Sequence, residues 1–326
     1  MKRFLKQILL AAVLPVILIL GLFEYTLRSA PNDYALKDEW MTKNTDVRIL
    51  SFGSSHAYYG IRPQYFNEKA FNLAFTSQSL KYDHYLYHKY VPLCDSLEFI
   101  ILPISYFTLR QNMDGGAESW RIKGYCIYMD CDYYAYDISK NLEISSKDKL
   151  NSIFDVLFRG KTFLSCDSLG WGVNYSYKDR AKDWQASGVT AVERHTKTNK
   201  EMLDENISYL EDMIEDTKKR GIEVILLTTP TFYTYRDNLD ESQLHEMVEL
   251  CDNLAHKYDH VSYLNWLQHD SFTADDYFDA DHLNEYGAEK LSKLLNEYIL
   301  KLENELLLES ASPANTIREN GIIFNE

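Results

Sequence analysis

VRILSFGSSH, residues 47–56, is the stretch that decides the fold of this chain. Its first six residues, Val47 to Phe52, have the apolar character of a buried strand, and Gly53 with the two serines after it marks a tight turn. In sheets of parallel strands, ligands and reactive side chains gather where such strands end. The turn therefore makes Ser55 the first candidate for a nucleophile.

A carboxylate and an imidazole lie far downstream, in Asp279-Ala280-Asp281-His282. A serine hydroxyl needs a base within hydrogen-bond reach and a third group that orients the base. His282 is the candidate base, and Asp279 is close enough in a turn to hold the imidazole Nδ1–H. Asp281 is adjacent to His282, and its side chain is expected to point elsewhere. Each motif alone is common, so it is their pairing that predicts a Ser55–His282–Asp279 site.

Composition predicts a folded and strongly acidic protein. The chain has 326 residues, of which 45% are hydrophobic and 14% aromatic, enough for one enlarged domain or a domain with an insertion. Its net charge is −15, because 34 Lys and Arg face 49 Asp and Glu. This acidity excludes nucleic acid as a partner, and it gives the protein no electrostatic attraction to anionic lipid headgroups. The 25 tyrosines suit a groove that binds sugar, although ordinary packing and surface positions are the favoured explanation.

The five cysteines form no CxxC pair, so a zinc site is not expected, and no metal or cofactor is assigned. Cys126 and Cys131 are close enough in sequence to form a local bridge. Buried free thiols are the favoured interpretation of all five.

The N-terminal segment is basic at residues 1–6, and Phe4–Phe23 is apolar enough to cross a bilayer as a helix. The basic flank predicts that the N-terminus stays inside the cell and that the folded part lies outside the membrane. An uncleaved, single-pass signal anchor over residues 1–28 is favoured over a signal peptide that is cleaved near Ala30.

Strands and helices alternate along most of the remaining chain, which predicts a parallel sheet with helices on both faces. Strands are expected at 47–52, 70–74, 97–104, 222–229 and 261–264. Helices are expected at 80–90, with Ser77 as the N-cap, and at 200–220, 241–258 and 284–305. The alternation is lost from about 106 to 199, and this segment is predicted to be an insertion that covers the site.

Three serines follow the first three predicted strands, namely Ser55, Ser77 and Ser105. Because the carboxyl ends of parallel strands share one edge of a sheet, we expect these serines to meet there. The backbone N–H of Ser55 is placed to bind a developing oxyanion. His56, next to the nucleophile, could contact substrate, although a packing role is the more common one.

With these motifs the chain resembles the SGNH/GDSL hydrolase superfamily. Residues 52–55, Phe-Gly-Ser-Ser, are similar to its first block, with Ser55 as the nucleophile, and residues 279–282 are similar to its last block. Residues 72–77 are similar to the second block, which implies an oxyanion N–H from Ser77 in place of the usual glycine. The third block is replaced by Pro-Ile-Ser-Tyr at 103–106, where Ser105 is the candidate donor.

The resemblance implies a flavodoxin-like three-layer α/β/α fold with a central parallel sheet of about five strands and a large insertion after the third strand. The expected boundaries are an anchor at 1–28, a stalk at 29–45, a hydrolase-like domain at 46–308 with its insertion at 106–199, and a tail at 309–326.

A Gly-Ser-Ser first block and a membrane anchor are similar to one branch of the superfamily, which holds the D-alanine transfer protein of teichoic-acid systems and periplasmic polysaccharide O-acetyltransferases. The resemblance implies a serine esterase or O-acyltransferase outside the cytoplasm, acting on an acylated glycan or cell-envelope polymer through an acyl-serine. An integral-membrane acyltransferase is the implied partner. A non-catalytic glycan-binding or assembly protein on a degenerate fold remains an alternative, as does a membrane-anchored assembly protein without an ancestral site.

Overall fold

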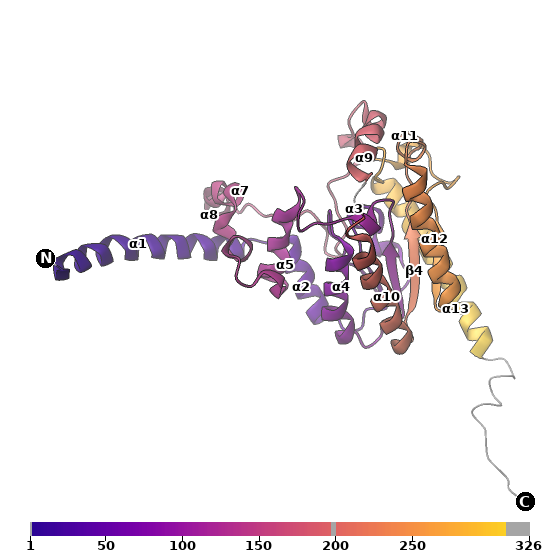
Figure 1. Ribbon diagram of the computed structural model, residues 1–326, viewed down its shortest axis with the longest axis horizontal. Coiled ribbons are helices and arrows are strands. Elements are labelled where there is room, and N and C mark those ends of the chain that lie inside the picture. Colours follow the sequence, from indigo (N-terminus) through magenta and orange to yellow (C-terminus); the bar gives the residue numbers. More distant parts are fainter. Residues whose placement is uncertain (1, 197–199, 311–326) are drawn as a thin grey trace, which may run out of the picture.

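The computed structural model describes residues 2–196 and 200–310. At its centre is a sheet of five parallel strands in the order β2-β1-β3-β4-β5 (Figure 1). The strands are β1 (Ile49–Ser51), β2 (Ala70–Asn72), β3 (Phe99–Pro103), β4 (Glu223–Thr228) and β5 (Val261–Asn265). This order is the flavodoxin-like one, in which the direction of strand addition reverses between β1 and β3. The predicted fold class is therefore confirmed, including the insertion after the third strand.

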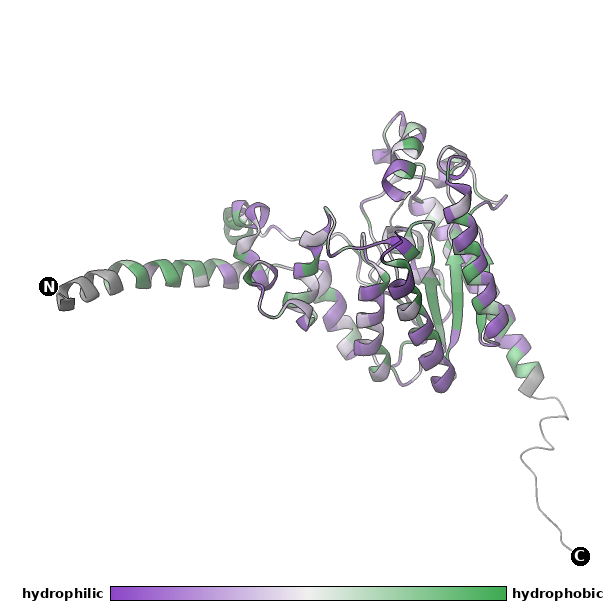
Figure 2. Ribbon diagram, viewed as in Figure 1, coloured by the Kyte–Doolittle hydropathy of each residue, from purple (hydrophilic) through white to green (hydrophobic). Residues whose placement is uncertain are grey.

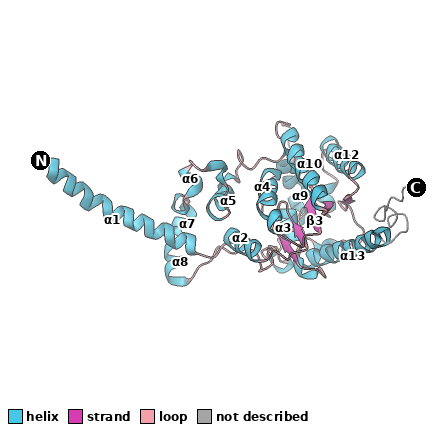
Figure 3. Ribbon diagram, turned by 90° about the horizontal axis from the view of Figure 1, so that it is seen from below, coloured by secondary structure: helices cyan, strands magenta, loops and turns pink. Residues whose placement is uncertain are grey.

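Helices lie on both sides of the sheet (Figure 3). The two faces bury two separate cores, because successive side chains of a strand point to opposite faces. One core receives Leu50, Ile100, Leu102, Val224 and Leu226. It is closed by α4 (Leu80–Tyr90), α10 (Leu203–Arg220) and α12 (Glu241–Lys257). The other core receives Ile49, Phe99, Ile101, Ile225 and Leu227, and it is closed by α3 (Ser55–Gly60) and α13 (Glu285–Ser310).

The helices agree with the sequence prediction except at their caps and ends. Ser77 is not the N-cap of α4, because Ser79 occupies that position and Ser77 adopts a left-handed backbone with φ of 61°. Gly221 ends α10 in the left-handed conformation, with φ of 68°, as expected of a C-terminal glycine. Helix α13 continues to Ser310, and the rest of the predicted tail, from 311 to 326, lies outside the described residues.

The N-terminal helix α1 (Lys2–Ser29) projects away from the body of the molecule (Figure 1). Figure 2 shows its run of hydrophobic residues. Within the described residues, Ala11–Ser29 is the one helical window long and apolar enough to cross a membrane, and 6% of it is buried. A membrane anchor and a signal peptide both have this length and composition.

The segment after α1 packs against the domain, which its polar sequence did not reveal. It forms α2 (Asp33–Lys43), and Met41 of this helix lies in the first core. Lys37 is fully buried because its ammonium donates to the carbonyl of Ala74 at 2.5 Å and lies 4.3 Å from the centre of the Phe75 ring. The region predicted as a stalk at 29–45 thus contains a helix with side chains inside the folded body.

The insertion after β3 consists of loops and short helices. These are α5 (Ile122–Tyr128), α6 (Ile138–Asn141), α7 (Lys147–Asn151), α8 (Ile153–Arg159) and α9 (Ser187–His195). Helices α7 and α8 lie beside the C-terminal part of α1, where the Glu24 carboxylate accepts hydrogen bonds from the N–H groups of Glu143 and Ile144 (Figure 1). All five cysteines are free thiols, as favoured from the sequence, but Cys94 and Cys126 are only partly buried.

Asn72, at the end of β2, ties α3 to the sheet. Its side-chain amide donates to the carbonyls of Ala57 and Ile61 at 2.9 and 2.8 Å, and its oxygen accepts from the Ala74 N–H at 2.9 Å. The residue is fully buried. It therefore satisfies three backbone groups that no water can reach.

We expect Asn72→Ala to lower the free energy of unfolding by about 2–4 kcal/mol, because it leaves buried carbonyl and N–H groups without partners. Urea unfolding followed by circular dichroism measures this. Asn304→Ala, on the exposed part of α13, is the matched control and should change stability by less than about 0.5 kcal/mol. Equal effects of the two substitutions would show that Asn72 does not hold the helix in place.

Candidate active site

Ser55 begins α3 directly after the turn that follows β1. The turn depends on Gly53, whose φ of 112° is a conformation that L side chains rarely adopt. A Cβ atom at this position would also lie 3.4 Å from both Ala57 and Pro103. The chain thus passes close to the end of β3 and presents Ser55 at the point where the strand order reverses.

Asp83 of α4 holds the same turn through a hydrogen bond to its backbone. Its Oδ1 accepts from the Gly53 N–H at 2.7 Å and from the Gln78 side chain at 2.6 Å. Burial of the carboxyl raises its pKa to about 7, although both hydrogen bonds favour the ionised form. No sequence motif marks Asp83, because its contact with the Gly53 turn exists only once the fold brings α4 beside that turn.

The structure brings together Ser55, His282 and Asp279. His282 Nε2 lies 2.8 Å from Ser55 Oγ, and His282 Nδ1 lies 2.9 Å from Asp279 Oδ1. The same Asp279 oxygen accepts from the His282 backbone N–H at 2.8 Å, so the carboxylate holds both ends of the residue. Asn284 closes the loop by accepting from the Tyr286 and Gly287 N–H groups at the start of α13.

The charge around His282 favours its protonated form. Burial of the imidazole opposes protonation, but the carboxylates of Asp279 and Asp281 outweigh burial and raise the pKa of His282 to about 9. The ring is 6% exposed, so water screens these charges little.

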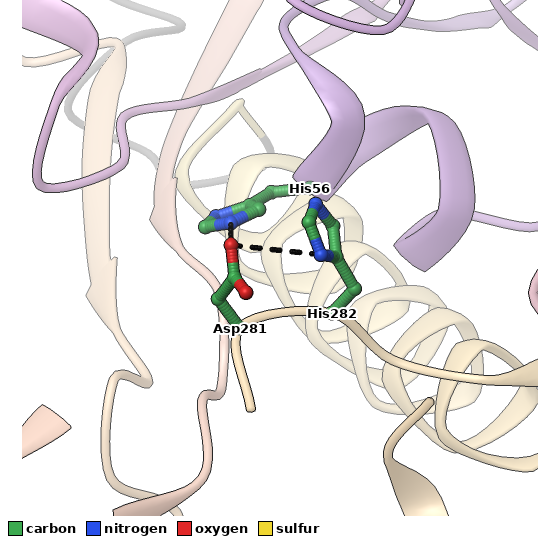
Figure 4. A group of neighbouring side chains, drawn as sticks. All are labelled: His56, Asp281 and His282. Atoms are coloured by element: carbon green, nitrogen blue, oxygen red, sulfur yellow. Dashed lines mark ion pairs between the residues drawn. The ribbon is translucent and has the colours of Figure 1, made fainter. Parts of the chain in front are cut away.

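Asp281 does not point elsewhere, contrary to the expectation from the sequence. It is 2% exposed, and its Oδ2 lies 3.5 Å from His282 Nδ1 and 3.7 Å from His56 Nε2 (Figure 4). Burial alone would raise the pKa of Asp281, but the histidines around it hold that pKa well below its usual range. Asp281 therefore places a second negative charge beside the imidazole of His282, and this one is buried, whereas Asp279 is partly exposed.

His56 is part of this buried network and is not a surface residue. Its Nδ1 lies 2.8 Å from Ser105 Oγ and 3.3 Å from Thr229 Oγ1, while its Nε2 faces Asp281. Burial lowers the pKa of His56, which leaves the ring neutral at pH 7. His56, which directly follows Ser55, thereby connects the start of α3 with the ends of β3 and β4.

Two residues of the insertion reach the site without having been singled out in the sequence. Arg194 at the end of α9 brings its guanidinium to 3.5 Å from Asp281 Oδ2. His195 follows it, lies 3.9 Å from the same oxygen and bonds to the Tyr235 hydroxyl at 2.8 Å. No sequence signal marked either residue, because the connection between 195 and 281 exists only in three dimensions.

The three candidate oxyanion donors are in different states. In the described part of the chain, the backbone N–H groups of Ser55 and Ser77 have no hydrogen-bond acceptor. The N–H of Ser105, in contrast, donates to Thr108 Oγ1 at 2.9 Å, and the Ser105 hydroxyl is bonded to His56. Ser55 and Ser77 can therefore offer a donor, and Ser105 is occupied within the protein.

A stack of three aromatic rings covers one side of His282. Tyr59 stacks on Tyr175 of the insertion with centroids 3.7 Å apart, and Tyr175 stacks on Phe278 at 4.1 Å. The His282 ring stands edge-on to Tyr175 at 5.2 Å. The insertion therefore contributes a wall of the site, while a cavity of about 870 Å³ lined by Tyr34, Lys123 and their neighbours lies elsewhere.

His56, Asp281 and His282 are close enough for one ligand atom of each to face a shared metal ion (Figure 4). Both nitrogens of His282 already face Ser55 and Asp279, however. An ion at this position would compete with those two hydrogen bonds, so we assign it no part in the chemistry.

No protein-family model matches the chain, and no curated protein matches it.

Solved structures of esterases and lipases are similar to it in overall arrangement. A GDSL-like lipase from Bacteroides thetaiotaomicron is 12% identical, with a TM-score of 0.40, over 82% of this chain and 100% of the lipase. An acetyl xylan esterase is 11% identical, with a TM-score of 0.38, over 78% of this chain and 99% of the esterase. A catalytic mutant of an acetylxylan esterase from Geobacillus stearothermophilus is 11% identical, with a TM-score of 0.37, over 76% and 92% of the two chains. Similarity at this level carries no statement about substrate or mechanism.

The raised pKa of Asp83 predicts a pH-dependent stability. Between the ordinary pKa of an aspartate, near 4, and the folded value of about 7, the folded protein binds a proton that the unfolded chain releases. The contribution of Asp83 is therefore complete below pH 4 and is lost as the pH rises through 7.

Asp83→Asn keeps the acceptor for the Gly53 N–H, and it should remove the loss of stability that Asp83 causes as the pH rises. Urea unfolding at pH 5 and pH 8 should show a smaller fall in stability for the variant than for the wild type. Asp237→Asn, at an exposed carboxylate, serves as control and should behave as the wild type does. An unchanged fall in the Asp83 variant would contradict the assignment.

Proposed function

We propose that the chain is a serine esterase or O-acyltransferase that acts on an acylated cell-envelope carbohydrate through an acyl-serine intermediate. The observation that carries this proposal is the 2.8 Å contact between His282 Nε2 and Ser55 Oγ, with Asp279 on the other ring nitrogen. A hydroxyl, an imidazole and a carboxylate in this order are the groups that nucleophilic acyl transfer requires.

In the proposed reaction, His282 accepts the Ser55 proton as the hydroxyl attacks the carbonyl carbon of the ester. Asp279 holds the ring with Nδ1 protonated, so Nε2 faces the nucleophile as a base. The carbonyl oxygen becomes an oxyanion that the N–H groups of Ser55 and Ser77 can bind. His282 then returns the proton to the leaving alcohol, and the acyl group stays on Ser55.

The second half of the reaction decides between hydrolysis and transfer. Water as the acceptor gives an esterase, and a sugar hydroxyl gives an O-acyltransferase. In either case His282 deprotonates the acceptor as it attacks the acyl-serine. The stacked rings of Tyr59, Tyr175 and Phe278 offer a flat apolar wall of the kind on which a sugar ring packs.

We further propose that α1 is a single-pass anchor and that the domain lies outside the cytoplasm. The apolar window of α1 and the basic residues before it support this placement. Exposed apolar side chains of α8, Phe154, Leu157 and Phe158, occur at i, i+3 and i+4, beside the C-terminal part of α1. Such a face suits the membrane–water interface, where an integral-membrane acyltransferase could hand over an acyl group.

A non-catalytic glycan-binding or assembly protein is the second candidate function. It is favoured by one observation, the occupation of both Ser105 groups by Thr108 and His56. This leaves two backbone donors for an oxyanion, and loss of a donor costs on the order of a hundredfold or more in rate.

A fluorophosphonate probe separates the two candidates. We expect the full chain in detergent to be labelled once, at Ser55, as read by mass spectrometry of the digested protein. Ser54→Ala removes the neighbouring hydroxyl and should leave labelling intact, whereas Ser55→Ala should abolish it. Ser55→Ala should also reduce hydrolysis of an acetyl ester by roughly a thousandfold or more. Failure of the wild type to react, while a control esterase does, would exclude a nucleophilic Ser55.

The pH profile tests the role of the buried carboxylate of Asp281. Because only neutral His282 can act as the base and its pKa is raised to about 9, kcat/KM should increase with pH through an apparent pKa above 6.5. Removing the charge in Asp281→Asn should move this limb of the profile, the rise of kcat/KM with pH, to lower pH. An exposed carboxylate, changed in Asp270→Asn, is the control. A limb that stays in place in the Asp281 variant would show that its charge does not reach the base.

A further inference from the structure

Two histidines and an aspartate converge on the surface where α4 packs against α10 (Figure 1). His84 and His88 are four residues apart on α4, so they share one face of that helix. Asp212 comes from α10 and faces both of them. This group lies on the outside of the helical layer and shares no residue with the Ser55 site.

The three ligand atoms form a small triangle. His84 Nε2 and His88 Nε2 lie 2.9 and 2.7 Å from the same Asp212 oxygen, and the two nitrogens lie 3.1 Å from each other. A tetrahedral zinc ion with bonds of about 2.0–2.1 Å keeps its ligands about 3.3 Å apart. The edges of the triangle therefore need to lengthen by about 0.2 to 0.6 Å for one ion to contact all three atoms at once.

The surroundings orient these side chains and leave them accessible. The ring of Tyr209 lies 4.9 Å from His84, and that of Tyr87 lies 5.1 Å from His88. The side chains of His84, His88 and Asp212 are 22%, 41% and 56% exposed, so an ion can enter and water can complete its coordination. The chain as a whole carries a net charge of −15, which attracts cations.

We propose that His84, His88 and Asp212 bind one divalent transition-metal ion, with Zn²⁺ as the best match. Two imidazole nitrogens and one carboxylate suit Zn²⁺, whereas Mg²⁺ and Ca²⁺ prefer sites made of oxygen alone. The ion joins α4 to α10 across 124 residues of sequence. His84 directly follows Asp83, so the ion also fixes the part of α4 that holds the Gly53 turn.

The cysteines of the sequence do not indicate this metal site, because they form no CxxC pair. The available signal was the spacing of His84 and His88 at i and i+4, which places two imidazoles on one helix face. The third ligand, Asp212, could not be found in this way because it comes from another helix.

Isothermal titration of the full chain in detergent with Zn²⁺ at pH 7 tests the site. The wild type should bind one ion here, and both Asp212→Asn and the double substitution His84→Ala/His88→Ala should weaken this binding by at least about tenfold. His245→Ala is the matched control, because His245 is an exposed histidine that also has a carboxylate, Glu249, four residues away. The control should bind Zn²⁺ as the wild type does, and Mg²⁺ should not bind to this site.

Two further readouts distinguish this site from the histidines near Ser55. The absorption of bound Co²⁺ should show tetrahedral coordination in the wild type and lose that signal in the double variant. Zn²⁺ should raise the unfolding temperature of the wild type and of His245→Ala, but not of the double variant. Unchanged Zn²⁺ affinity in the double variant, or no binding to the wild type, would overturn the proposal. Neither result depends on whether Ser55 is a nucleophile.

Discussion

The hydrogen bond between Ser55 and His282 joins residues 227 positions apart, and the fold must hold both of its ends. One end is a turn at Gly53, whose positive φ suits glycine and which passes close to the end of β3. The other is a loop that Asn284 and Asp279 fasten at the start of α13. Because α3 and α13 pack together on one face of the sheet, both ends belong to the same core. A contact of hydrogen-bond length is therefore maintained by two packed helices and by a loop whose own hydrogen bonds fix its shape.

Buried charge surrounds that contact and is balanced only in part. Asp281 lies among three imidazoles and one guanidinium, and Asp279 and Asp281 both face Nδ1 of His282. An isolated carboxylate would pay a large desolvation penalty there, so the cluster is tolerated because opposite charge and hydrogen bonding accompany it. Arg194 comes from the insertion, which means that the added segment contributes to the electrostatics of the site as well as to its walls.

The fold was largely predictable because its signals are local. Hydrophobic runs gave the five strands, and apolar periodicity gave α4, α10 and α12, since both depend on neighbours in sequence. Ser55, His282 and Asp279 could be proposed from the sequence because each lies in a short motif, and the structure places the three side chains within hydrogen-bond distance. Asp83, His56 in its buried role, Asp281 and His195 required the tertiary structure. The helix α2 was missed for a related reason. Its Lys37 can be buried only because the carbonyl of Ala74 accepts a hydrogen bond from the ammonium and the ring of Phe75 lies beside it, and neither partner is visible in the local sequence.

Ser77 is the residue at which local strain and the site coincide. A side chain other than glycine in the left-handed region costs on the order of 1 kcal/mol or more, and such strain persists only where the surroundings enforce it. Here the Gln111 side chain donates to the Ser77 carbonyl at 2.8 Å and fixes the orientation of the following peptide. The Ser77 N–H is left without an acceptor in the described part of the chain, on the same sheet edge as Ser55. The proposed oxyanion-binding position requires an unpaired, preorganised donor, because such a donor does not have to reorient when charge develops. A glycine would relieve the strain at no cost to the N–H, so the left-handed conformation of Ser77 is due to the surroundings that hold it and not to its side chain.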